Sequence, residues 1–154
     1  MAISIVSSIV SDVKTMLLER HAQHVVLIHF PIALFMIGVI FDLLSRGKRD
    51  SQFSRAAYLN LSVAAVTVLP AIITGLLAWQ LAFGGTPLDG MILFHLIAAS
   101  FAGLLVVASW WIHWRRRRSE ILALFRYRIP IELLGIIVIA VAAHTGGFVS
   151  GVNQ

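Results

Sequence analysis

The chain has 154 residues, of which 59% are hydrophobic and only 12% are charged. Because it contains several apolar runs of about 20 residues, long enough to cross a bilayer, this composition predicts one integral membrane protein and excludes a water-soluble fold. The absence of cysteine excludes disulfides, iron–sulfur clusters, cysteine-attached haem and thiolate metal sites, which leaves histidine as the soft metal ligand. The net charge of +5 arises from two short basic clusters between apolar segments, a pattern typical of a topology signal and not of nucleic-acid binding.

Residues 1–20 precede the first long apolar run and combine apolar and polar residues with a helical period. Ile9, Val13 and Leu17 share one face of the predicted helix, whereas Asp12 lies off it. The segment lacks the early basic region and the uninterrupted apolar core of a signal peptide. We therefore expect an amphipathic interfacial helix that lies on one membrane face.

Residues 21–154 contain four apolar segments, which predict an all-α membrane domain folded as an up-down bundle of four transmembrane helices. Pro31 lies near the first turn of the first segment, and Pro70 supplies a cause for a kink in the second. No internal repeat is convincing in the sequence. The four predicted spans are about 25–44, 56–83, 91–111 and 131–149.

Lysine and arginine are distributed unevenly between the two sides of the predicted bundle. The side opposite the basic loops has only Lys14 and Arg20. Because basic residues favour the cytoplasmic side, we expect a multi-pass protein of the bacterial inner membrane with both termini on the extracytoplasmic side. The loops after the first and third spans hold the other basic residues: Arg46, Lys48, Arg49, Arg55, Arg115, Arg116, Arg117, Arg118, Arg126 and Arg128.

Three of the six histidines lie at matching depth on three different spans. His29, His95 and His144 are each about four or five residues from the outer end of a span, roughly 6 to 8 Å deep at a rise of about 1.5 Å per residue. Trp79 of the second span reaches the same depth. An imidazole in hydrocarbon is costly, which marks this layer as a functional-site hypothesis. We expect the membrane interfaces to hold the other three histidines: His21, His24 and His113.

The histidine layer predicts a metal centre, and b-type haem with two axial histidines fits it best. Haem iron binds neutral imidazole without cysteine, and a macrocycle fits between bundle helices that carry small residues. Because the first and third helices are diagonal in a simple bundle, we expect His29 and His95 as axial ligands, with His144 as the alternate and Trp79 beside the cofactor. A zinc or copper site made by the histidines and a quinone site are the alternatives.

A purely structural interpretation competes with the haem hypothesis. Intramembrane histidines also form hydrogen bonds between helices without any ligand, which predicts a non-catalytic accessory subunit with no cofactor. Asp42 precedes Arg46 by four residues at the basic end, so we expect an ion pair within the helix. The sequence does not assemble a nucleophile, a base and an orienting group, so we expect no independent enzyme activity.

Several stretches of the chain carry a family resemblance. They are His24-Val-Val-Leu-Ile-His29-Phe-Pro-Ile-Ala-Leu34, Asp42, Thr74-Gly-Leu-Leu-Ala-Trp79, Phe94-His-Leu96 and Ala143-His-Thr-Gly-Gly-Phe-Val149. Over about residues 21–152 the chain resembles the DUF2231 family of four-span bacterial membrane proteins. Where that family usually has proline after its first histidine, this chain has Val25. Some members look like partners of cytochromes or respiratory components, so the resemblance implies that the histidines are functional.

Together these observations predict a membrane redox subunit that holds a b-type haem near the extracytoplasmic face. It would pass electrons within a larger respiratory or photosynthetic-type complex. The expected partners are other subunits of that complex, membrane lipids, and a cytochrome c or a quinone.

Overall fold

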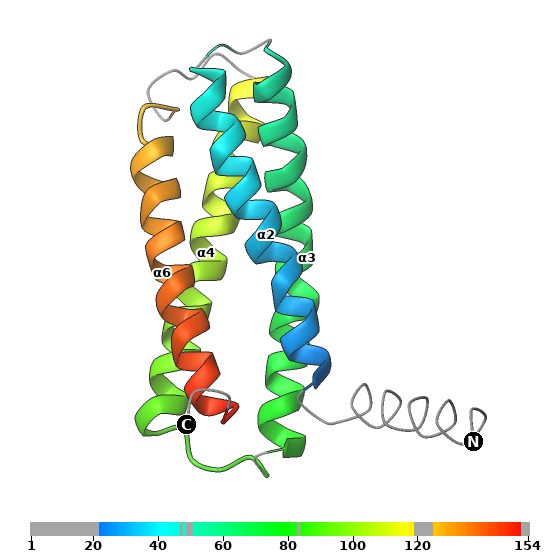
Figure 1. Ribbon diagram of the computed structural model, residues 1–154, viewed down its shortest axis with the longest axis vertical. Helices are drawn as coiled ribbons and strands as arrows, with labels where there is room; N and C mark the ends of the chain where they lie inside the picture. Colours follow the sequence, from blue (N-terminus) through cyan, green and yellow to red (C-terminus); the bar gives the residue numbers. More distant parts are fainter. Residues whose placement is uncertain (1–21, 47, 49–50, 83, 119–124, 152–154) are drawn as a thin grey trace, which may run out of the picture.

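The computed structural model describes residues 22–46, 48, 51–82, 84–118 and 125–151, so the predicted interfacial helix over residues 1–20 lies outside the described residues. The described part contains four helices, each long and apolar enough to cross a membrane. They run up and down in chain order (Figure 1), which confirms the predicted all-α membrane bundle. The helices are α2 (Ala22–Ser45), α3 (Gln52–Ala82), α4 (Gly90–Arg118) and α6 (Arg128–Val149).

The helices extend beyond the predicted spans, and α4 does so by the largest margin. It continues through its four arginines to Arg118, because arginine is a good helix former and its charge is favourable at a helix C-terminus. Helix α2 already begins at Ala22, so Pro31 lies buried inside the helix and not near its first turn. Pro70 likewise lies inside α3.

The bundle consists of two antiparallel hairpins. Helix α2 packs along α3, and α4 packs along α6 (Figure 1). We call the end of the bundle that holds Arg115–Arg118 the basic end. The buried core lies in the middle of the bundle and toward the basic end, and it consists of Phe35, Val39, Leu61, Ala64, Val68, Ala102, Val106 and Ile139.

Glycines allow the helices to approach closely in this core. A Cβ atom added at Gly135 of α6 would lie 2.7 Å from Cζ of Phe35 in α2, and one added at Gly38 would lie 2.9 Å from Cγ of Leu61 in α3. Both distances are shorter than real contacts allow. Small residues thus set the spacing of the helices, as is common where lipid provides no hydrophobic driving force between them.

The opposite end of the bundle is much less buried. Within residues 22–30 of α2 and 90–97 of α4, no side chain is buried. The two hairpins also diverge toward this end in Figure 1. They therefore meet mainly in the half of the bundle that includes the basic end.

Candidate functional site

His29 and His144 lie on exposed faces of their helices. Nδ1 of His29 donates a hydrogen bond to the carbonyl oxygen of Val25, one turn earlier in α2, at 2.6 Å. The ring of His144 meets the ring of Phe148 edge to face, with centroids 5.0 Å apart. The structure thus places both imidazoles at the surface of the bundle, and their role as haem ligands stays a prediction.

Trp79 and His95 are half-buried. Nε1 of Trp79 donates a hydrogen bond to the carbonyl oxygen of Thr86 at 3.0 Å, which ties the end of α3 to the turn that follows it. His95 faces the neighbouring helix α6. His95 is therefore a predicted site residue whose hydrogen bond links two transmembrane helices.

His95 binds α6 through one ring nitrogen. Its Nδ1 donates a hydrogen bond to the carbonyl oxygen of Ala142 at 3.0 Å and lies 3.4 Å from Oγ1 of Thr145. The ring fits because position 146 is glycine, where an added Cβ would lie 2.9 Å from Cε1 of His95. The surface of α6 is therefore shaped for this imidazole.

His24 makes the same set of contacts in the other hairpin. Its Nδ1 donates a hydrogen bond to the carbonyl oxygen of Ala71 in α3 at 3.1 Å and lies 3.3 Å from Oγ1 of Thr74. A Cβ added at Gly75 would lie 2.9 Å from Cε1 of His24. Besides the interfacial position expected for it, His24 thus has a contact with α3 that the sequence did not predict, because its ring is half-buried there.

The two hairpins repeat one another at these contacts. In each, the accepting carbonyl lies 47 residues after the histidine and the threonine lies 50 residues after it. The structure thus reveals an internal repeat that the sequence alone did not. Its matched pairs, all with the same offset, are His24 and His95, Ala71 and Ala142, Thr74 and Thr145, and Gly75 and Gly146.

These contacts fix which ring nitrogen carries the hydrogen. A carbonyl oxygen only accepts, so both neutral imidazoles carry the hydrogen on Nδ1 and a lone pair on Nε2. Neither Nε2 of His24 nor that of His95 has a hydrogen-bond partner within the described part of the chain. The rings come from opposite hairpins, His24 from α2 and His95 from α4. Together they can offer two oriented nitrogen lone pairs.

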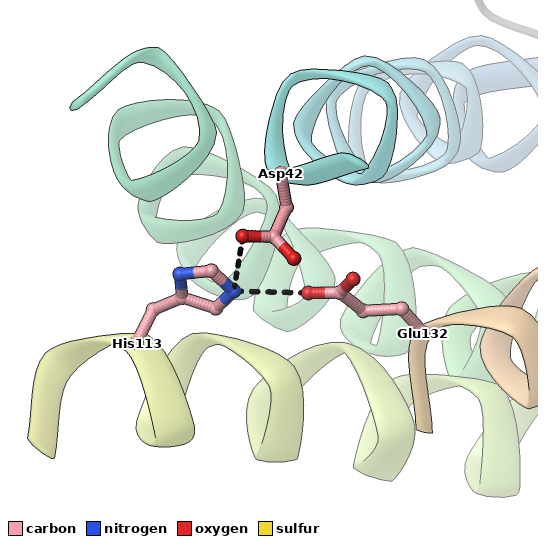
Figure 2. Close-up of side chains that lie close together, drawn as sticks. All are labelled: Asp42, His113 and Glu132. Carbon is pink, nitrogen blue, oxygen red and sulfur yellow. Dashed lines mark hydrogen bonds and ion pairs between the residues drawn. The ribbon is translucent and has the colours of Figure 1, made fainter. Parts of the chain in front are cut away.

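A second polar site lies at the basic end, where three helices contribute one side chain each. Asp42 comes from α2, His113 from α4 and Glu132 from α6, and their polar groups point toward one another (Figure 2). Nε2 of His113 lies 2.9 Å from Oε1 of Glu132 and 3.8 Å from Oδ1 of Asp42. Both carboxylates are 0% exposed and His113 is 4% exposed. We call these three residues the acid–histidine cluster.

The surroundings of the acid–histidine cluster leave some polar atoms without partners. Nε of Arg128 donates a hydrogen bond to Oδ2 of Asp42 at 2.6 Å, which joins α6 to α2. In contrast, Oε2 of Glu132 is buried without a hydrogen-bond partner, and so is Oγ of Ser109 in α4. Two buried oxygen atoms of the described structure, one of them in the cluster itself, therefore lack a hydrogen-bond partner.

The cluster corrects one sequence-based expectation and adds contacts that the sequence did not predict. His113 is buried, because α4 continues past it and places it between the ends of α2 and α6. Asp42 pairs with Arg128 of the other hairpin and not with Arg46, whose φ of 49° ends α2. A signal was present in the sequence, since Asp42 and Glu132 are the acids inside the predicted spans and such a charge requires a partner.

Comparisons with known proteins agree with this architecture. A family model described as a predicted membrane protein, DUF2231, matches residues 20–152, which include all four described helices and both polar sites. No curated protein and no solved structure matches the chain. Because the family model covers most of the chain, the protein belongs to the DUF2231 family of predicted membrane proteins.

Proposed function

We propose that this membrane protein binds a b-type haem between its two hairpins, with His24 and His95 as the axial ligands, and that it transfers electrons. The observation that carries the proposal is the matched orientation of the two imidazoles. Each donates its Nδ1 hydrogen to a backbone carbonyl and so keeps the Nε2 lone pair for another group. Histidines that bind a metal typically have their second nitrogen held in this way, because the hydrogen bond fixes the tautomer and the ring orientation.

The chemistry of the site fits haem iron. Iron in b-type haem accepts two neutral imidazoles and requires no thiolate, and this chain has no cysteine. The two histidines come from opposite hairpins, so a macrocycle held by both would lie between α2 and α4. The internal repeat thus supplies one such imidazole from each hairpin.

The packing of the bundle also supports a bulky occupant at this end. The segments that carry the two histidines, residues 22–30 and 90–97, contain no buried side chain, whereas the core lies further toward the basic end. A bound haem would cover part of the apolar surface that both segments leave exposed, which includes Val26, Phe30, Phe94 and Ile97. Haem supplies a large, flat and mainly apolar group of that kind.

The proposal replaces His29 by His24 as the partner of His95. The sequence favoured His29 because of its depth, but its exposed position and its bond to Val25 support the other choice. His144 is also exposed, and in this proposal it is not a ligand. These two histidines provide matched controls, one in each hairpin.

We further propose that the haem works within a larger complex of the bacterial inner membrane. Because basic residues favour the cytoplasmic side, we assign the basic end to that side in this proposal, and the two haem ligands would then lie near the extracytoplasmic face. A haem at that depth can exchange electrons with a cytochrome c or with quinone in the membrane. The protein would then be an electron-transfer subunit without an independent enzyme activity.

The test is a visible spectrum of the purified protein with quantification of haem iron. We expect a b-type reduced-minus-oxidised difference that is lost in His24→Ala and in His95→Ala and is kept in His29→Ala and His144→Ala. Loss in His29→Ala with retention in His24→Ala would overturn our ligand assignment. A colourless wild-type protein from haem-supplemented cells would overturn the haem proposal and favour an accessory subunit in which the two histidines only join helices.

A further inference from the structure

The geometry points to a binding site for one divalent transition-metal ion in the acid–histidine cluster, with Asp42, His113 and Glu132 as its ligands. This inference does not depend on the proposed haem, because the cluster lies at the basic end, whereas His24 and His95 lie near the opposite ends of α2 and α4. It concerns a second, separate site in the same protein.

The positions of the ligand atoms suit a metal ion. One ligand atom from each of the three residues can be chosen so that all three lie within 4.8 Å of one another. An ion bound at about 2.0 to 2.2 Å from each ligand holds neighbouring ligand atoms roughly 3 to 3.6 Å apart. The measured separations from Nε2 of His113, 2.9 Å and 3.8 Å, lie on either side of that range. Small side-chain shifts suffice for coordination once the hydrogen of His113 has moved from Nε2 to Nδ1, which frees the Nε2 lone pair for the ion.

The cluster also lacks the positive charge that its buried acceptors require. Arg128 offsets the charge of Asp42, with which it forms a 2.6 Å hydrogen bond. Glu132 is fully buried, and its Oε2 has no partner, while a single N–H of His113 faces both carboxylates. A buried carboxylate oxygen without a partner is costly, so a bound cation at this point would supply the partner that Oε2 of Glu132 lacks.

Neighbouring groups are placed to support such an ion. Arg128 binds Oδ2 of Asp42 and leaves Oδ1 directed to His113, which orients the carboxylate as an outer-shell partner does in known metal sites. Ser109 precedes His113 by one helical turn, and its buried Oγ has no partner in the described structure. This hydroxyl could bind a water molecule on the ion.

The ligand set selects a class of metal. Calcium and magnesium prefer sites made of oxygen atoms, whereas one imidazole with two carboxylates suits Zn²⁺, Mn²⁺ or Fe²⁺. Cobalt(II) is a useful spectroscopic probe for this class because its visible bands report the coordination geometry.

The experiment is a titration of the chelator-treated full-length protein in detergent with Co²⁺, followed by competition with Zn²⁺. We expect about one equivalent of Co²⁺ to give visible d–d bands, and these bands to disappear when Zn²⁺ is added. Glu132→Gln and His113→Gln should each weaken binding at least tenfold. The matched controls Asp89→Asn and His29→Gln, which alter an exposed acid and an exposed histidine, should bind like the wild type.

Gel filtration and thermal unfolding check that every variant folds. If a variant does not fold, the titration of the wild-type protein still tests whether the cluster binds a metal ion. Failure of the wild type to bind Co²⁺, Zn²⁺ or Mn²⁺ would overturn the proposal. So would unchanged affinity in folded Glu132→Gln. An infrared band of a protonated carboxylic acid that is lost in Glu132→Gln and insensitive to added metal would identify a proton as the occupant instead. Because chelation leaves haem in place, the haem spectrum and the metal titration can fail independently.

Discussion

His95 contacts α6 in the same way that His24 contacts α3. Both rings donate from Nδ1 to a carbonyl 47 residues further along the chain, at 3.0 Å and 3.1 Å. Both also sit over a glycine that leaves no room for a Cβ atom. Two histidines held alike in two hairpins indicate a shared task, which the proposed haem would supply.

The glycines beneath the two histidines provide a first prediction. We expect Gly75→Ala and Gly146→Ala each to push the imidazole away from its carbonyl, because the new Cβ would lie 2.9 Å from Cε1. Haem occupancy, measured by reduced-minus-oxidised spectra at equal protein concentration, should fall severalfold in each variant. Gly103→Ala is the control, since its Cβ meets only Cγ1 of Val68, at 3.3 Å. Full occupancy in both histidine-site variants would contradict the proposed ligand geometry.

The close approach of α6 to α2 leads to a second prediction. Gly135→Ala should destabilise the bundle by about 1 to 3 kcal/mol, because the added methyl group would overlap the ring of Phe35, which is completely buried. Thermal or detergent-induced unfolding monitored by circular dichroism measures the change. Gly103→Ala again serves as the control and should destabilise the bundle less than Gly135→Ala does. Equal stability of the two variants would show that the helices can separate easily at Gly135.

The ion pair between the hairpins gives a third prediction. Arg128→Gln leaves the charge of buried Asp42 without its partner, so we expect the free energy of unfolding to fall by about 3 kcal/mol or more. The double variant Asp42→Asn with Arg128→Gln should lose less than the sum of the single variants, because it leaves no uncompensated charge. Arg55→Gln, which alters an exposed arginine, should change the unfolding free energy by less than about 0.5 kcal/mol. Strictly additive losses in the double variant would argue against direct coupling.

Two phenylalanines of α2 give a fourth prediction about the core. Phe35 is 0% exposed, whereas Phe30 is 55% exposed. Phe35→Ala should lower the free energy of unfolding by about 2 to 3 kcal/mol. This is less than the roughly 3 to 5 kcal/mol typical of water-soluble cores, because lipid and not water solvates apolar surface in the unpacked state. Phe30→Ala should have little effect. A larger loss in Phe30→Ala would mean that a partner covers that face in the assembled protein.

The sequence could predict the number, approximate position and alternating direction of the helices. These features depend on hydrophobicity summed over about 20 residues and on the distribution of basic residues, and both are local properties of the chain. It could also identify His95 as a candidate site residue. It could not choose between His24 and His29, because depth in the membrane follows from position along a helix, whereas the direction of a side chain depends on rotation about the axis.

That rotation is hard to read from this sequence because the helices are apolar on all sides. Lipid-facing and core-facing positions both carry leucine, isoleucine and valine, so no polar face marks the outside. His24 and His29 are five residues apart, about 1.4 turns, and therefore point in clearly different directions. Only the packing of α2 against α3 decides that His24 faces inward.

For the acid–histidine cluster too, the sequence determined one part and the tertiary structure decided the other. By itself the sequence determined that Asp42 and Glu132 lie in apolar segments and must find partners, since a charge in that environment is costly. The tertiary structure alone decided that those partners are His113 and Arg128 from other helices. Such pairings depend on which helices meet and at what height. Both are set by close packing between helices at residues such as Gly135 and Phe35.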